Sequence, residues 1–284
     1  MIRARWILAA AALAVAGCDG PADRVEEAIA LRHAGKPREA VQVLGAVLAD
    51  LGDRRLPPDL DEVRLVALRH AADAAYLELG DYQAAIAYYR RLVALAPGGD
   101  AALRARAAIG DIYRDRLGDR VAAIAQYAGV AASQSPEAPR YQLEVARQYL
   151  ALGNLEQARS EARTLASRWP ADPLAPEASL LAARALAQAG HARDAIAEYE
   201  ALARSSAAVA PLAAEEAAAL YAEEGRLDRA LALYEGSLST HPNPDAVRAH
   251  MEALRRRRVA AGVPRPGDRA AALERRPLPT ARTR

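Results

Sequence analysis

The residue with the most specific chemistry is Cys18, the only cysteine of the 284-residue chain. It follows an apolar run from Trp6 to Ala16, which comes after the basic residues Arg3 and Arg5. The run is much shorter than the roughly 20 residues that a membrane-spanning helix needs, and this layout is typical of a secretory signal peptide. A thiolate can form a thioether with a lipid, and no second cysteine is present for a disulfide. The two alternatives for Cys18 are therefore a covalently modified thiol and a buried free cysteine.

The sequence Val15-Ala16-Gly17-Cys18 resembles the lipobox of bacterial lipoproteins. The resemblance implies cleavage after residue 17, with diacylglycerol and an acyl chain on Cys18 and no other cofactor. It implies a lipid-anchored protein of the cell envelope that faces the periplasm. Asp19 is the residue that keeps enteric lipoproteins in the inner membrane, whereas the resemblance of the chain as a whole slightly favours the outer membrane. The choice of membrane stays open.

Other chemistry-bearing residue types lack the spacing of known sites. The five histidines do not occur in a metal-binding pattern, and the serines lack a Gly-x-Ser-x-Gly elbow. No glycine-rich phosphate loop is present, and the pairs Glu215-Glu216 and Glu223-Glu224 are typical of solvated helix faces. We therefore predict that the protein is not an enzyme and binds no metal.

A spaced pair of small residues repeats along the chain. Glycine is followed five residues later by alanine at six places that are 35 to 45 residues apart, namely Gly35/Ala40, Gly80/Ala85, Gly118/Ala123, Gly153/Ala158, Gly190/Ala195 and Gly225/Ala230. The glycine suits a tight turn between two helices, and the alanine lets those helices approach closely. In most repeats leucine or tyrosine follows the alanine by four residues, and proline ends the second helix.

These units, of which "AYLELGDYQAAIAYYRRLVALAPGG" is the clearest, resemble tetratricopeptide repeats (TPR). The resemblance implies an all-α superhelical solenoid of about six helix-turn-helix repeats with a C-terminal capping helix. Repeat three carries one extra residue before Gly118. The expected organisation is a signal peptide (1–17), a lipidated N-terminus (18–20), a divergent first repeat (21–54), a loop (55–65), repeats two to six (66–244), the capping helix (245–261) and a disordered basic tail (262–284).

In TPR proteins the first helix of each repeat lines a concave face that binds partner segments. Counting from the glycines places five arginines on or near that face: Arg104, Arg114, Arg140, Arg147 and Arg184. They predict a basic groove for an acidic or carboxylate-ended segment, and the alternative is a set of solvated arginines.

Positive charge is concentrated at the C-terminal end, where residues 245–284 contain eleven arginines and four carboxylates. Its densest point is Arg255, Arg256, Arg257 and Arg258. Three interpretations are a solvated helix end, contact with anionic lipid headgroups, and binding of nucleic acid. An envelope location argues against nucleic acid as a partner.

The combination of lipobox and repeats resembles helical lipoproteins of the bacterial envelope, among them the TPR lipoprotein of the β-barrel assembly machine and the pilotins of type IV pili. It implies a non-catalytic, membrane-anchored scaffold that docks an envelope protein segment in its groove. The alternative is a ligand-binding regulator that captures a peptide or glycan fragment and modulates a neighbouring envelope enzyme. A repeat motif by itself specifies a fold rather than a partner.

Overall fold

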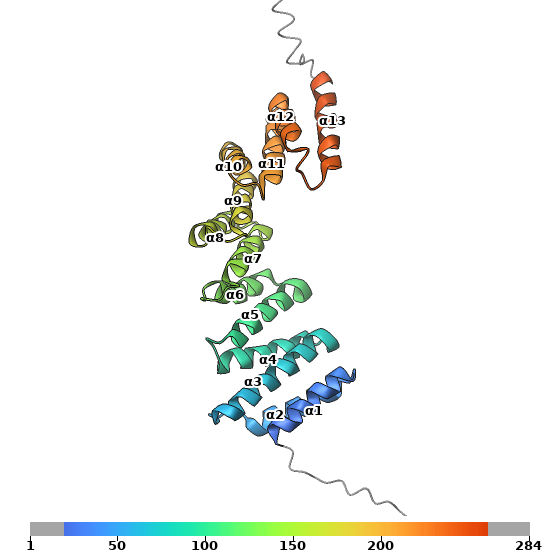
Figure 1. The fold of residues 1–284 in the computed structure, drawn as a ribbon, viewed down its shortest axis with the longest axis vertical. Coiled ribbons are helices and arrows are strands. Elements are labelled where there is room, and N and C mark those ends of the chain that lie inside the picture. The colour runs from blue at the N-terminus through green and yellow to red at the C-terminus, as the bar shows by residue number, and fades with distance from the viewer. Residues whose placement is uncertain (1–19, 261–284) are drawn as a thin grey trace, which may run out of the picture. The chain divides into compact units, whose positions relative to one another are not determined.

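The computed structural model describes residues 20–260, and all regular structure in this range is helical. The chain forms two compact units, Met1–Val130 and Ala131–Arg284. Within each unit, helices that follow one another in the sequence pack in antiparallel pairs (Figure 1). The predicted all-α fold of six helical hairpins and a terminal helix is confirmed. Cys18, Asp19, the signal peptide and the tail from 262 to 284 lie outside the described residues.

The described part of unit 1 contains three hairpins. Their elements are α1 (Pro21–His33) with α2 (Pro37–Leu51), then α3 (Pro58–Asp73) and the π-helix η1 (Ala74–Leu79) with α4 (Tyr82–Leu95), and then α5 (Asp100–Ile112) and the π-helix η2 (Tyr113–Leu117) with α6 (Arg120–Ala131). Each hairpin is therefore a first helix, a short turn and a second helix.

Unit 2 contains three further hairpins and the terminal helix. They are α7 (Ala138–Ala151) with α8 (Leu155–Arg168), α9 (Ala175–Gln188) with α10 (Ala192–Ser205), and α11 (Ala210–Glu223) with α12 (Leu227–Ser237), followed by α13 (Pro244–Ala260). The apolar residues Val247, Met251 and Leu254 of α13 are buried with residues of α11 and α12. The helix thus covers the last hairpin of the described chain.

The repeated glycines and alanines have the roles that the sequence predicts. All six glycines have φ between +66° and +85°, which is the left-handed region where a side chain would be strained. All six alanines are fully buried. Of the residues four positions later, Tyr127 and Tyr199 are also fully buried. Small residues at the turn and at the helix contact therefore define each hairpin.

The extra residue before Gly118 widens the last turn of a helix. In hairpins two and three the amide groups of Asp81 and Asp119 bond to carbonyl groups six residues earlier, at Ala75 and Tyr113. In unit 2 the corresponding bonds, such as Asn154 to Tyr149, span five residues. Hairpin three thus accommodates its additional residue in η2, because a π-helical turn holds one more residue than an α-helical turn, and hairpin two has the same wide turn in η1.

The connection between hairpins one and two differs from the prediction of a loop over residues 55–65. Helix α3 already begins at Pro58, because proline is favourable in the first helical turn, where its missing N–H has no partner to lose. The buried side chain of Arg64 donates to the carbonyl oxygens of Gly52 and Arg54, at 2.8 and 2.9 Å. The loop is therefore confined to residues 52–57 and is fastened to α3.

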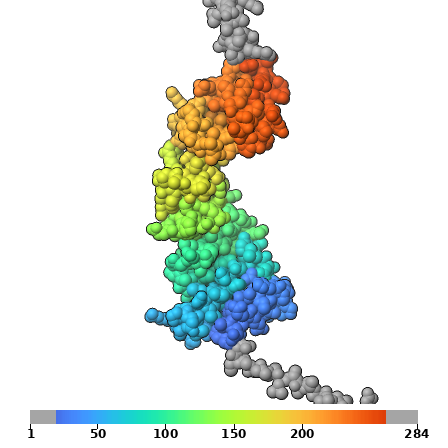
Figure 2. Space-filling model, viewed as in Figure 1, coloured from blue at the N-terminus to red at the C-terminus, as the bar shows by residue number. Residues whose placement is uncertain are grey.

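Side chains close the spaces between neighbouring helices within each unit (Figure 2). In α5, Gly110 faces the Tyr127 ring, and a Cβ atom there would lie under 3.0 Å from three ring atoms. Among the described helices none is both long and apolar enough to cross a membrane.

Candidate functional site

Two ion pairs connect the first helices of consecutive hairpins in unit 2. Arg147 of α7 reaches Glu177 of α9, with 2.5 Å between Nη2 and Oε1, and it also bonds to Glu144 of its own helix. Arg184 of α9 lies 2.8 Å from Oε1 of Glu216 on α11. These five residues form what we call the first-helix ladder, because they run across α7, α9 and α11.

The ladder is half-exposed, with side-chain exposure of 41% for Arg147 and 39% for Arg184. Burial works against the charged form of Arg147, but hydrogen bonds to Glu177 and Glu144 outweigh it and raise the pKa of the guanidinium. Half-exposed ion pairs contribute little to stability, about 0–1 kcal/mol each. The ladder is therefore accessible to a partner, and its ion pairs can be exchanged for contacts with that partner at low cost.

The repeat pattern explains why these arginines lie at the contact between hairpins. Arg147 and Arg184 each follow a fully buried alanine, Ala146 and Ala183. The alanine lies against the neighbouring helix, so the next residue is placed at the margin of the same contact. From there a long guanidinium side chain can reach the following first helix.

The five predicted groove arginines are divided between the two units. In unit 1, Arg104 is exposed on α5 without an ion pair in the described chain, and Arg114 bonds to Asp111 and Asp115. In unit 2, Arg140 pairs with Glu137 and lies over the Tyr141 ring, 5.4 Å from its centre. Arg147 and Arg184 are paired in the ladder, so four of the five arginines form ion pairs with nearby carboxylates.

The first helices of unit 2 do not form a basic surface. Against three arginines they carry five glutamates, namely Glu144, Glu177, Glu215, Glu216 and Glu223. The prediction counted the arginines because a repeat register shows which residues share a face, but it omitted the carboxylates of the same helices. These three helices therefore have mixed charge, with a small excess of acidic residues.

The arginines of the last helix are also engaged. Arg255 pairs with Glu235 at 3.0 Å, and Arg258, which is 13% exposed, pairs with Asp228 at 2.9 Å. Arg257 donates to the Ala222 carbonyl oxygen, and Arg256 lies 3.9 Å from Glu252. This cluster therefore fastens α13 to the last hairpin, which reduces the positive charge that it can offer to a lipid surface.

A histidine completes the C-terminal end of unit 2. The backbone N–H of Asn243 donates to Nδ1 of buried His241, so the proton of the neutral ring is assigned to Nε2. That nitrogen lies 2.9 Å from Glu215, to which it donates. The contact fixes the connection before α13 against α11.

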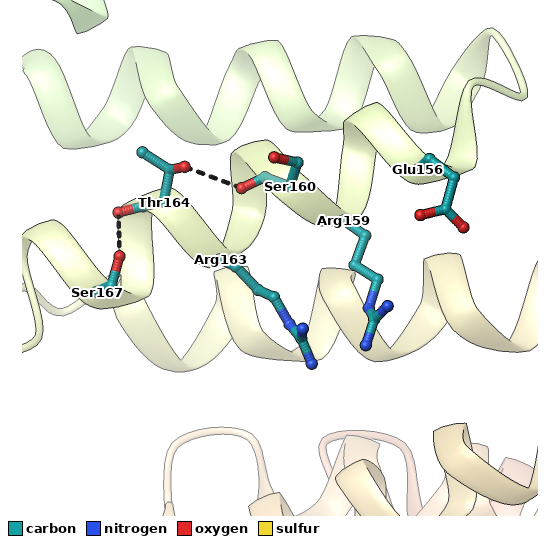
Figure 3. A pocket seen from close by; sticks show the side chains of 6 residues that line it. All are labelled: Glu156, Arg159, Ser160, Arg163, Thr164 and Ser167. Carbon is teal, nitrogen blue, oxygen red and sulfur yellow. Dashed lines mark hydrogen bonds between the residues drawn. The ribbon is translucent and has the colours of Figure 1, made fainter.

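On the other side of unit 2, a shallow hollow of about 410 Å³ lies along α8. Figure 3 shows Arg159 and Arg163 extending from α8, while the Thr164 and Ser167 hydroxyl groups donate to carbonyl oxygens of their own helix. Both arginines meet Glu198 of α10, at 3.5 and 2.7 Å. The second helices are thus joined in the same way as the first helices, and the hollow has no cluster of catalytic side chains.

Sequence reasoning missed the acidic members of the ladder, although a signal for them is present. Glu177 follows Arg147 by 30 residues and Glu216 follows Arg184 by 32 residues, each somewhat less than one repeat. Opposite charges at this separation on consecutive first helices indicate an ion pair between hairpins.

The comparisons with known proteins agree on the fold. The tetratricopeptide repeat family matches residues 74–98. The C-terminal part of a TPR repeat-containing protein from Cytophaga hutchinsonii is 17% identical, with 81% of this chain and 88% of that chain covered and a TM-score of 0.57. The Naa15/Naa10 structure with HypK-THB is 16% identical, with 84% of this chain and 34% of that chain covered and a TM-score of 0.58. The comparison with curated proteins finds no match. The chain therefore has a TPR-like fold, which is typical of protein–protein interaction scaffolds.

Proposed function

We propose that this protein is a non-catalytic scaffold, anchored by lipid at Cys18 to an envelope membrane and facing the periplasm, that docks a segment of an envelope protein on its first helices. The observation that carries the docking surface is the first-helix ladder. It presents donors and acceptors side by side on the first helices of three consecutive hairpins and is only half-buried.

The mixed charge of the ladder determines what kind of segment fits. A purely acidic segment would have to displace Glu177 and Glu216 from the arginines and would meet the remaining glutamates. A segment that carries both carboxylates and basic or amide groups can replace both members of an ion pair. We infer a partner segment of mixed charge, rather than an acidic one.

Site-specific photocrosslinking in cells tests the docking surface. A photoreactive residue at Arg147 is expected to capture one defined envelope protein, and Arg163 on α8 is the matched control because it is also a half-exposed, ion-paired arginine. The capture should decrease when Glu177 is changed to Arg. Equal capture from both positions would contradict a docking site on the first helices.

The lipid anchor rests on the lipobox resemblance and needs its own test. The mature N-terminal peptide is expected to begin at Cys18 and to carry the mass of the acyl groups, and Cys18→Ser should release the chain from membranes. Fractionation of the Asp19→Ser variant tests the choice of membrane. We favour the outer membrane, and an inner-membrane location that does not change with Asp19→Ser would contradict this preference.

The alternative function is a regulator that captures a free peptide or glycan fragment. The half-exposed arginines of the ladder also suit such a ligand. A scaffold is expected to purify from detergent extracts in a fixed complex, whereas a ligand sensor should purify alone and gain thermal stability when ligand is added. The same preparation distinguishes the two functions.

A further inference from the structure

One edge of unit 1 carries both the start of the described chain and the loop between hairpins one and two. Because α1 and α2 are antiparallel, the first residues of α1 lie beside the last residues of α2, and Arg24 pairs with Asp50 at 2.6 Å. We call residues 20–24 and 50–58 the anchor edge. The glycine turns, Gly35 and its equivalents, lie at the opposite ends of the same helices.

The loop of the anchor edge is held in a fixed position. Buried Arg64 binds two of its carbonyl oxygens, and Arg91 at the end of α4 pairs with Asp53 at 2.8 Å. Leu56 packs against the core of the unit. These contacts fix the backbone of the loop on both sides of residues 54 and 55, whose side chains are exposed.

Those side chains are the exposed residues Arg54 and Arg55. Within the described residues, neither guanidinium has a hydrogen bond or an ion pair. Nearby carboxylates are already used, since Asp50, Asp53 and Asp61 each pair with another arginine, and Asp23 accepts from the Gly20 N–H at 2.9 Å. Asp59 and Glu62 of α3 are exposed exceptions, and Asp59 lies in the first turn, where it complements the helix dipole. The loop therefore carries two cations without partners, unlike the cluster on α13.

The distance to the anchor follows from the sequence. Only Asp19 separates Cys18 from Gly20, so an extended chain allows at most about 7 Å between them. Electrostatic attraction to a charged surface acts over about 8 Å at physiological ionic strength. An anchor at Cys18 would therefore hold Gly20, and with it the anchor edge, close to the lipid headgroups.

We propose that Arg54 and Arg55 bind the phosphate groups of anionic lipids in the membrane that holds the Cys18 anchor, and thereby orient unit 1 with its anchor edge against the bilayer. This inference rests on the proposed lipid anchor. It assigns the lipid contact to a loop of unit 1 rather than to the arginines of α13. Two basic residues near an anionic surface favour this orientation by about 30-fold.

The test uses the full lipidated protein in phosphatidylcholine vesicles, with or without phosphatidylglycerol. Because the chain has no other cysteine, Asp59→Cys and Gln83→Cys each supply a single free thiol for a fluorophore, the first at the anchor edge and the second beside the Gly80 turn. A quencher attached to lipid headgroups should quench the probe at 59 much more than the probe at 83, and only when phosphatidylglycerol is present.

A matched pair of variants identifies the residues responsible. Arg54→Ser with Arg55→Ser should abolish the extra quenching at 59. Arg38→Ser with Arg116→Ser removes the same charge from the edge with the glycine turns, and it should leave the quenching unchanged. Equal quenching at 59 and 83, or quenching at 59 that survives the loss of Arg54 and Arg55, would overturn the proposal.

The mass of the mature N-terminal peptide distinguishes a failure of the loop contact from a failure of the lipid anchor. An acylated Cys18 with no preferential quenching refutes the loop contact alone. An unmodified Cys18 refutes the anchor and, with it, the contact that depends on the anchor.

Discussion

Hairpins two and three of unit 1 differ from hairpins four and five of unit 2 at the same place in the repeat. In each of these first helices a small residue lies at the contact with the second helix. The residue that follows it is an aspartate in unit 1 (Asp73 and Asp111) and an arginine in unit 2 (Arg147 and Arg184). The aspartates accept hydrogen bonds from tyrosines inside their own hairpin, whereas the arginines reach the next hairpin. One repeat position therefore either strengthens a single hairpin or connects two hairpins.

The turns of these hairpins differ as well. In hairpins two and three the first helices end in π-helical turns, and in hairpins four and five they end in regular turns. Gly110 shows how closely the helices of hairpin three approach, since it has no space for a side chain against Tyr127. Alanines such as Ala146 and Ala183 occupy the equivalent positions in unit 2. The contact inside hairpin three is thus closer than those inside hairpins four and five.

The largest expected effect comes from adding a methyl group to this contact. Gly110→Ala should destabilise unit 1 by about 1–3 kcal/mol, because the Tyr127 ring must move. Urea unfolding gives the free energy, and hydrogen exchange of α6 locates the change in unit 1. Gly45→Ala is the matched control: a Cβ atom there would lie 3.9 Å from the Tyr88 hydroxyl, and the change should stabilise α2 by about 0.5–1 kcal/mol. Unchanged stability of Gly110→Ala would contradict the close approach.

The tyrosines allow a second test of the difference. The Tyr127 hydroxyl donates to Asp111 at 2.7 Å, whereas the Tyr199 hydroxyl is buried without a partner in the described structure. Tyr127→Phe should therefore cost about 1–2 kcal/mol of unfolding free energy, and Tyr199→Phe should be neutral or slightly stabilising. Thermal and urea unfolding of the two variants measure the difference. Equal losses would show that the aspartate does not distinguish the hairpins.

Much of this architecture could be predicted from local sequence. Gly80 with Ala85 and Tyr89 specifies one hairpin, because the turn, the close contact and the filling side chain lie within ten residues of one another. The sequence also shows the extra residue before Gly118, and the structure accommodates it in a π-helical turn. The turn itself could not be predicted, because an extra residue can also be accommodated by a longer loop.

The candidate site was less predictable than the hairpins. The partner of Arg184 is 32 residues away, and its identity depends on how two hairpins pack rather than on the sequence of either one. The length of the predicted loop over residues 55–65 was overestimated for a related reason. Pro57 and Pro58 indicate a helix boundary, but not on which side of it the helix lies, and α3 begins at the second proline.

Ion pairs between first helices provide a third and smaller contrast. In unit 1, Arg32 of α1 pairs with Glu78 of η1, with side-chain exposure of 14% and 30%, whereas Arg184 and Glu216 are 39% and 36% exposed. A double-mutant cycle with Gln at each position should give a coupling of about 1 kcal/mol for the first pair and about 0.5 kcal/mol or less for the second. High salt should reduce the second coupling further. A larger coupling for Arg184 with Glu216 would reverse this ranking of the two units.

The smallest expected effect is a pH dependence in unit 1. Burial, with Arg69 and Arg32 close by, lowers the pKa of His70, and Arg32 donates to its Nδ1 at 2.8 Å. The unfolded chain therefore binds a proton near the ordinary pKa of about 6.5, while the folded unit does not. Unit 1 should lose stability as the pH falls below that value, and His70→Gln should remove this part of the loss. Urea unfolding at pH 7.5 and 5.5 measures it, and His33→Gln, an exposed change at the end of α1, is the control. A native chain that becomes relatively more stable than His70→Gln at the lower pH would show that His70 gains a proton on folding, which contradicts the direction of the shift.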